Sequence, residues 1–270
     1  MKKTVDPNFC PKCGKQHQEP QSKITVCQEC KEKVIAEKAI ADKKKAEEQA
    51  KLEAVKRDPM FNPVKTVSDL TKVRRVEPGD VIACDKNGWY FFPKERDSTP
   101  DILKLLIPNV AIFCDWGGVA SLFLEDEKRN YIKTPKKINK PIGKSAWIFS
   151  YTPTNKIKEC EEMRLASSAA GFDGMIITTL KGVDDEGTAL NELGKHQLMT
   201  ALLKGWNHDI PNYYEDTAAV LDHLSEGDSG KNVNKFWVIP AGSPHREMKP
   251  KRDDIKGIEQ KDFLNQIIKL

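Results

Sequence analysis

The chain has 270 residues, of which 39% are hydrophobic and 31% charged, and its formal net charge is +4. This apolar content excludes a fully disordered chain, and no uncharged stretch approaches the ~18 apolar residues of a membrane-spanning helix. The first residues carry two lysines without an apolar run behind them, so we expect no secretory signal and no membrane partner. The odd number of cysteines, seven, also argues against a disulfide framework and favours a cytoplasmic, reducing location.

Four of the cysteines form two Cys-x-x-Cys pairs near the N-terminus, Cys10 with Cys13 and Cys27 with Cys30. Two residues between the members of a pair let both sulfurs reach one metal, and Gly14 permits the positive φ of the turn. Two such pairs complete the tetrahedral set of four thiolates that structural zinc prefers. The sequence therefore predicts one structural Zn²⁺ per chain, with no open coordination position and no catalysis at the metal.

These cysteines resemble those of a zinc ribbon, in which a CPxCG knuckle and a second CxxC knuckle lie on a small β-hairpin. The resemblance covers residues 7–32. It implies contact with nucleic acid or with another protein, because similar modules occur in transcription, replication and translation proteins. A redox-active pair is the alternative, but the strand-to-helix setting typical of such a pair is absent around both motifs.

Residues 28–57 contain no Gly or Pro and consist mainly of Ala, Glu, Lys and Gln, which favour a helix. Their apolar stripe is too thin for a coiled-coil seam, so we expect a solvated helical arm of ~40 Å. Pro59 ends it, because the residue before a proline leaves the helical region. The expected organisation is a zinc ribbon over 1–32, a charged helical arm over 33–57, a linker over 58–68 and a globular region over 69–270.

The globular region is predicted to mix strands and helices. Asn87-Gly88 between two β-rich runs is a strong hairpin signal. Strands are expected early and helices late, which favours an α+β fold over a regular alternation, with a β-rich part over 76–151 and an α-rich part over 152–270. Further strands are expected at 110–114, 119–124, 146–151, 174–179 and 235–240, and helices at 101–106, 155–170, 192–203, 215–224 and 258–270.

Positive charge is concentrated in the first part of the chain. Residues 1–75 hold 18 Lys or Arg against 11 Asp or Glu, whereas residues 76–270 hold 26 against 29. This asymmetry favours salt-dependent contact with the phosphates of DNA or RNA, without sequence readout. The alternative is that the lysines keep a small protein-docking module solvated. The predicted nucleic-acid contacts are Lys12, Lys15, Lys23, Lys31, Lys33, Lys43, Lys44, Lys45, Arg74 and Arg75.

No motif in the globular region identifies a catalytic site. The Gly-Lys-Ser at 143–145 lacks the earlier glycine of a phosphate-binding loop. The His-Asp doublet at 208–209 lacks the spacing of a metal-dependent phosphohydrolase. The acidic run at 184–186 is interpreted as a solvated loop before a cation site, and the aromatic run at 89–92 as core before a base-stacking surface.

The leading hypothesis is therefore a non-enzymatic zinc-ribbon protein that binds nucleic acid, or that binds a protein of the transcription or replication machinery. The second hypothesis is an assembly protein that docks on other subunits through its ribbon and arm. The third is a nucleic-acid-processing enzyme whose catalytic residues the sequence does not identify.

Overall fold

A computed structural model describes residues 9–16, 27–56, 62–140, 143–180, 193–240 and 249–269. The chain divides into two compact units, Met1–Arg57 and Asp58–Leu270. Within the described ranges, no helix combines the length and the apolar character needed to cross a membrane.

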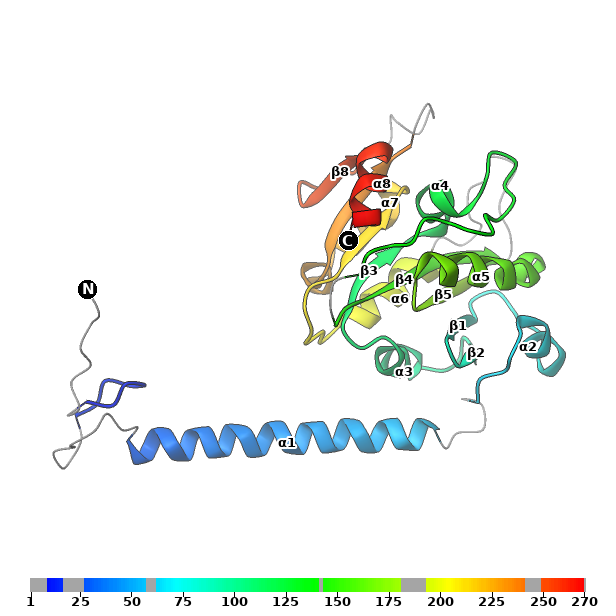
Figure 1. Ribbon diagram of the computed structural model, residues 1–270. Coiled ribbons are helices and arrows are strands. Elements are labelled where there is room, and N and C mark those ends of the chain that lie inside the picture. The colour runs from blue at the N-terminus through cyan, green and yellow to red at the C-terminus, as the bar shows by residue number, and fades with distance from the viewer. Residues whose placement is uncertain are drawn as a thin grey trace. The chain divides into compact units, whose positions relative to one another are not determined.

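The first unit is dominated by helix α1 (Gln28–Lys56), which is preceded by an antiparallel bridge between Phe9 and Gln16 (Figure 1). The predicted helical arm is therefore present and begins at the second cysteine pair. Every described side chain of α1 beyond Cys30 is exposed. The helix is held by the intrinsic preference of its Ala, Glu, Lys and Gln residues and not by an apolar face packed on a core.

The second unit is built on one mixed sheet with strand order β2-β1-β5-β4-β3-β6-β7-β8, which confirms the α+β prediction. β1 is antiparallel to β2 and to β5, and the other neighbours are parallel. The β1–β2 hairpin turns at the predicted Asn-Gly. The strands are β1 (Val81–Asp85), β2 (Gly88–Phe92), β3 (Val110–Cys114), β4 (Ser145–Pro153), β5 (Gly174–Leu180), β6 (Asn212–Glu215), β7 (Asn234–Ile239) and β8 (Ile255–Glu259).

From β3 onward, strands and helices alternate, and strands from both 76–151 and 152–270 join the same sheet. This differs from the expectation of strands first and helices later. Two short strands account for the difference. β6 ends at Glu215, where a helix was expected to begin, and the half-exposed edge strand β8 occupies the expected start of the last helix.

The segment 119–124 is helical, although a strand was expected there. It contains the irregular helical turn η2 (Trp116–Ala120) and α4 (Ser121–Leu124). A short apolar run fits a buried strand and a buried helix equally well, so the pattern alone did not distinguish them. The helical turn carries the chain away from the end of β3.

Helices cover both faces of the sheet (Figure 1). One core joins α2, α4, α5 and α8 to residues such as Ile112 and Ile148 of the strands, while α3, α6 and α7 pack together on the other face. All seven residues of β5 are buried, as expected for a central parallel strand. The remaining helices are α2 (Val67–Val73), α3 (Thr99–Leu106), η3 (Thr154–Glu159), α5 (Cys160–Ala170), α6 (Leu193–Leu203), α7 (Ala218–Ser225), η4 (Asp228–Asn232) and α8 (Gln260–Lys269).

The order of the parallel strands, β5-β4-β3-β6-β7-β8, reverses at β3. The chain first moves outward from β3 through β4 and β5, and then returns to the other side of β3 with β6, β7 and β8. A doubly wound sheet binds its ligands beyond the carboxyl ends of the strands at such a reversal. The carboxyl ends of β3 and β6 are therefore the first place to search for a functional site.

Candidate functional sites

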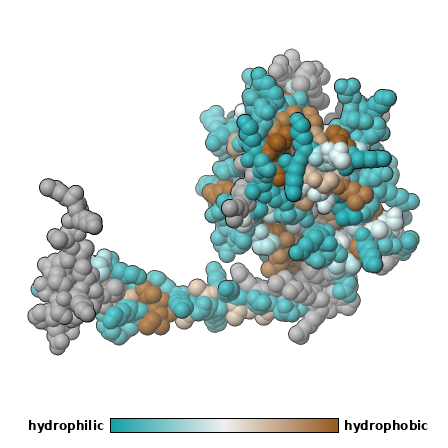
Figure 2. Space-filling model, viewed as in Figure 1, coloured by the Kyte–Doolittle hydropathy of each residue, from teal (hydrophilic) through white to brown (hydrophobic). Residues whose placement is uncertain are grey.

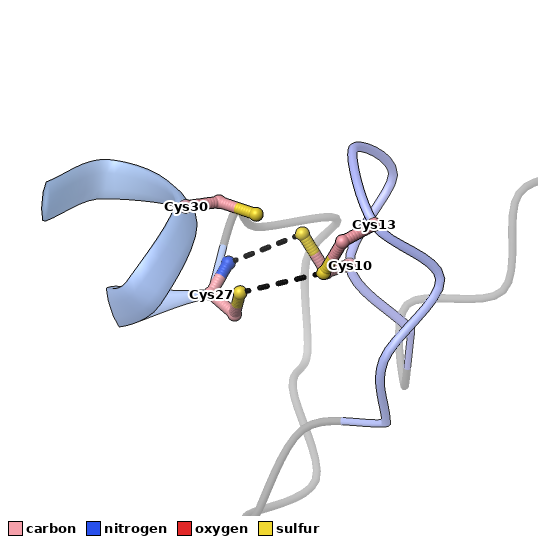
Figure 3. A group of neighbouring side chains, drawn as sticks. All are labelled: Cys10, Cys13, Cys27 and Cys30. Carbon is pink, nitrogen blue, oxygen red and sulfur yellow. Dashed lines mark hydrogen bonds between the residues drawn. The ribbon is translucent and has the colours of Figure 1, made fainter. Parts of the chain in front are cut away.

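The four N-terminal cysteines come together as predicted (Figure 3). Cys10 and Cys13 lie in the turn between Phe9 and Gln16, and their sulfurs face those of Cys27 and Cys30 at the start of α1. The four sulfur atoms lie within 4.8 Å of one another, and the Sγ atoms of Cys13 and Cys27 are 3.7 Å apart. A tetrahedral ion with metal–sulfur bonds of ~2.3 Å requires sulfurs ~3.8 Å apart, so the group is placed to hold one metal ion.

The second knuckle differs from that of the expected hairpin, because Cys30 lies in the first turn of α1. The backbone N–H of Cys27 donates to Sγ of Cys10 at 3.4 Å and lowers the pKa of the Cys10 thiol to about 6. Hydrogen bonding with Cys13 raises the pKa of Cys30 to about 12. The Cys10 thiol therefore ionises more readily than an ordinary thiol, whereas a metal ion must displace the proton of Cys30.

The basic residues predicted to contact nucleic acid fall into two groups, one in each unit. In the first unit, Lys15 pairs with Glu29 at 2.6 Å, and Lys23 lies outside the described residues. In the second unit, Arg74 and Arg75 follow α2 and are exposed. The other predicted contacts, all exposed, are Lys12, Lys31, Lys33, Lys43, Lys44 and Lys45.

Other residues singled out in the sequence are not gathered into a site. His208 lies beside Trp206, and Asp209 pairs with Lys144 at 2.6 Å. Trp89, Tyr90 and Phe92 are buried, so the aromatic run belongs largely to the core. The acidic run at 184–186 lies outside the described residues.

A second cluster, which the sequence did not predict, lies at the carboxyl ends of β3 and β6. Asp115 directly follows β3, Glu215 is the last residue of β6, and Asp216 comes next. One oxygen from each of the three carboxylates lies within 4.8 Å of the others. Because β3 and β6 are parallel neighbours, their carboxyl ends bring these residues to the same edge of the sheet.

Lys195, in the first turn of α6, lies between two of these carboxylates. Its Nζ donates to Oδ1 of Asp115 at 2.6 Å and to Oε2 of Glu215 at 2.5 Å. The side chain of Lys195 is 3% exposed, and those of Asp115 and Glu215 are 5% and 1% exposed. The three charged groups are therefore shielded from water, and the ion pairs of Lys195 with Asp115 and Glu215 compensate for their lost hydration.

Further hydrogen bonds orient the two buried carboxylates. Ser150 of β4 donates from Oγ to Oδ1 of Asp115 at 2.7 Å. Glu215 accepts from the Tyr213 hydroxyl at 2.5 Å and from the Thr217 backbone N–H at 3.1 Å, so both of its oxygens are engaged. Among the described residues, Oδ2 of Asp115 accepts no hydrogen bond. We name Asp115, Ser150, Lys195, Glu215 and Asp216 the switch-point cluster.

The turn after β3 closes over this cluster because it contains Gly117 and Gly118. A Cβ on Gly117 would lie 3.6 Å from Oδ2 of Asp115. Gly118 has φ +63°, and a Cβ there would overlap the carboxylate of Asp216. The two glycines thus let the backbone approach both acidic side chains closely.

The cluster holds more negative charge than its lysine compensates. Burial and repulsion by Glu215 raise the pKa of Asp115 to about 6, and the same two causes raise that of Asp216 to about 8. Burial opposes ionisation of Glu215, yet contact with Lys195 outweighs it and lowers the pKa of Glu215. When all three carboxylates ionise, two negative charges remain uncompensated, which is the charge that a divalent cation supplies.

No family model, no curated protein and no solved structure matches this chain. The chemistry and geometry of the two clusters are therefore what indicates a function for this chain.

Proposed function

We propose that the globular unit is a divalent-cation-dependent enzyme that hydrolyses a phosphate ester at the switch-point cluster. The observation that supports this proposal is the buried Lys195, which bridges Asp115 and Glu215 where the strand order reverses. A structural ion pair needs one carboxylate, whereas this lysine lies among three carboxylates and at the ligand-binding edge of a doubly wound sheet. Buried, coupled titratable groups at such a position are typical of active sites.

The donor set favours Mg²⁺, which prefers carboxylate oxygens and binds through few protein ligands together with substrate phosphate. Asp115, Glu215 and Asp216 are the residues that would hold it. When bound, the ion neutralises charge on the phosphoryl oxygens of the substrate. Lys195 adds a fixed positive charge beside the same group, so a dianionic phosphate ester is the substrate that fits this arrangement.

Asp115 is the residue proposed to act on phosphorus. Ser150 and Lys195 hold Oδ1, which leaves Oδ2 as the oxygen available to attack. In the first step a bond forms between Oδ2 and phosphorus while the ester P–O bond breaks, and the departing oxygen takes a proton from water. Water then attacks the phosphorus of the acyl phosphate, which releases inorganic phosphate and regenerates the carboxylate. Phosphate release with Mg²⁺, and its loss with EDTA, tests this activity.

Cation binding is expected to depend on pH, because protons compete for Asp115 and Asp216. Both carboxylates have raised pKa values, about 6 and about 8, so they become ligands only as pH rises through these values. We expect the affinity for Mn²⁺, measured by electron paramagnetic resonance as a Mg²⁺ substitute, to rise by up to about tenfold per pH unit over this interval. An Asp115→Asn/Asp216→Asn variant should lose this dependence, while the exposed Glu127→Gln should retain it. A pH-independent affinity would contradict the assignment.

For the N-terminal unit we propose Zn²⁺ as the bound ion, because four thiolates form a soft, closed donor set. Metal analysis of the purified chain should find one Zn²⁺ per molecule. Replacing Cys10 and Cys13 with Ser should abolish this zinc, whereas Lys12→Gln in the same turn should retain it. Retention of a full equivalent of zinc by the Cys10→Ser/Cys13→Ser variant would show that the ion lies elsewhere.

We further propose that the N-terminal unit attaches the enzyme to nucleic acid through α1. The supporting observation is that the lysines of α1 are exposed along a helix with no buried apolar face. Figure 2 shows a largely hydrophilic α1 with an apolar patch, and the large apolar side chains that the described part of α1 exposes are Val34, Ile35 and Ile40. The lysines favour nucleic acid, and this patch favours the alternative of docking on another protein.

Charge substitutions on α1 distinguish nucleic-acid binding from docking on another protein. Replacing Lys43, Lys44 and Lys45 with Gln should lower the affinity for single-stranded DNA. It should also lower the slope of log affinity against log salt by about 2, since each phosphate contact contributes ~0.7. The matched variant Ile35→Gln/Ile40→Gln should leave both quantities unchanged. The opposite pattern, or unchanged binding after loss of the three lysines, would favour docking.

A further inference from the structure

A basic pocket lies where β4 ends and includes Arg74 and Arg75, two of the predicted nucleic-acid contacts. It is lined on one side by α2 and the segment that follows it, and on the other by the first residues after β4, and its volume is about 680 Å³. Such a volume is within the range of small-ligand sites. Its polar and charged lining includes Lys72, Arg74, Arg75, Thr154 and Asn155, which we name the basic pocket.

Lys72 pairs with Asp69 at 3.2 Å, so Arg74 and Arg75 are the charges of the basic pocket that remain available to an anion. Among the described residues that line it, Glu77 is the one acidic residue, and it pairs with Lys94 at 3.3 Å. Arg74 lies over the ring of Phe91, 5.0 Å from its centre, which fixes the guanidinium in place. Arg75 is exposed and has no ion pair with another described residue.

Both walls of the basic pocket are anchored to the globular unit. Glu161 of α5 accepts from the backbone N–H of Val67 at 3.2 Å and from Nε1 of Trp89 at 2.8 Å. The same carboxylate pairs with Arg164 at 2.6 Å. The α2 wall is therefore tied to the helix that follows the Thr154 wall, so the pocket does not depend on the N-terminal unit for its shape.

Strand β4 connects the basic pocket to the switch-point cluster. Ser150, which donates to Asp115, lies four residues before Thr154, a separation of at most ~13 Å along an extended chain. The phosphates of one nucleic-acid strand follow at ~3.4 Å of helix rise. A strand with its terminal phosphate at Asp115 would therefore reach the basic pocket with a phosphate only a few nucleotides away.

We propose that the basic pocket binds a backbone phosphate of a nucleic-acid strand whose terminal phosphate ester is hydrolysed at Asp115. This inference rests on the proposed function and names its substrate class. Nucleic acid is favoured because the pocket presents two arginines beside the first residues after β4, the strand that carries Ser150. The chain that leads into α2 also carries an excess of positive charge, with 15 Lys or Arg against 10 Asp or Glu over residues 1–66. A small phosphate ester would fill the switch-point cluster without touching the basic pocket.

The test compares two substrates in the full chain, a terminally phosphorylated oligonucleotide of six nucleotides and p-nitrophenyl phosphate. Arg74→Gln/Arg75→Gln should lower kcat/KM for the oligonucleotide by about tenfold or more and its salt slope by ~0.7, from the one phosphate that the pocket binds. The same variant should leave kcat/KM for p-nitrophenyl phosphate within about twofold of wild type. The control Lys128→Gln/Arg129→Gln removes equal charge from an exposed turn and should leave both substrates unaffected.

Oligonucleotide binding, followed by fluorescence anisotropy in EDTA, separates the two proposals. If wild type binds the strand through Arg74 and Arg75 but hydrolyses neither substrate, the pocket stands and the phosphatase proposal fails. If both substrates are hydrolysed and the double variant retains full activity on the oligonucleotide, the pocket proposal is overturned. The pocket proposal is also overturned if Arg74→Gln/Arg75→Gln loses activity on both substrates. It is likewise overturned if activity on a phosphopeptide depends on these arginines while activity on the oligonucleotide does not.

Discussion

Asp115→Asn is expected to reduce phosphate release by at least about 10³-fold while the protein stays folded. The amide has nearly the shape of the carboxylate and can still accept a hydrogen bond from Ser150. It cannot supply the anionic oxygen that attacks phosphorus, nor an anionic ligand to Mg²⁺. The change also removes a buried carboxylate. The raised pKa of Asp115, about 6, means that its ionised form destabilises the folded protein. We therefore expect the variant to unfold at the same or a higher denaturant concentration than wild type.

Two further variants serve as comparisons for Asp115→Asn. Ser150→Ala removes one hydrogen bond to Asp115 but leaves the carboxylate and Lys195, so we expect a smaller loss of about tenfold. Glu127→Gln neutralises an exposed acid outside the switch-point cluster and should not change the rate. If Asp115→Asn kept more than about a tenth of the wild-type rate while folding normally, Asp115 would not be the residue that acts on phosphorus.

Lys195→Met is expected to lower the free energy of unfolding by about 3–5 kcal/mol. Lys195 is the buried cation that contacts both Asp115 and Glu215. Without it, these carboxylates must be protonated or remain charged in a site that excludes water. Urea unfolding followed by tryptophan fluorescence measures this unit selectively, because all five tryptophans lie after residue 58.

A double-mutant cycle tests the physical cause of that loss. Glu215→Gln removes one of the two charges that Lys195 compensates, so the pair Lys195→Met/Glu215→Gln should be destabilised by less than the sum of its single changes. The loss from Lys195→Met alone should also be smaller below about pH 6, where Asp115 is protonated. A loss below about 1 kcal/mol, typical of an exposed pair, would show that Lys195 is not the buried counter-ion described.

The cysteine cluster could be predicted from the sequence because its information is local. Each Cys-x-x-Cys pair places two sulfurs side by side through its spacing alone, and the two pairs are separated by few residues. Cys30 lies within the helix-favouring residues 28–57, but the ribbon resemblance predicted a hairpin around it. Residues after Cys27 favour a helix as strongly as those further along α1, so the helix simply begins earlier than the boundary expected from the ribbon resemblance.

The switch-point cluster could not be predicted in the same way, because its members are far apart in the sequence. Asp115, Ser150, Lys195 and Glu215 meet only because β6 returns to the far side of β3. β6 has four residues and was hidden in a segment that looked like a loop before a helix. A local signal did exist, since Asp115 and Glu215-Asp216 each end a short apolar or aromatic run. Without the strand order, that signal does not show that the two run ends are neighbours.

The most direct test of the account is phosphate release by the full chain after removal and return of Mg²⁺. Dialysed free of Mg²⁺, the protein should release no phosphate from p-nitrophenyl phosphate or from a terminally phosphorylated oligonucleotide, and adding Mg²⁺ should restore release from both. Adding Mg²⁺ to the Asp115→Asn variant should not produce phosphate release from either substrate. Release that is unchanged by removing Mg²⁺, or no release from either substrate with Mg²⁺ present, would contradict the assignment of the switch-point cluster as a catalytic site.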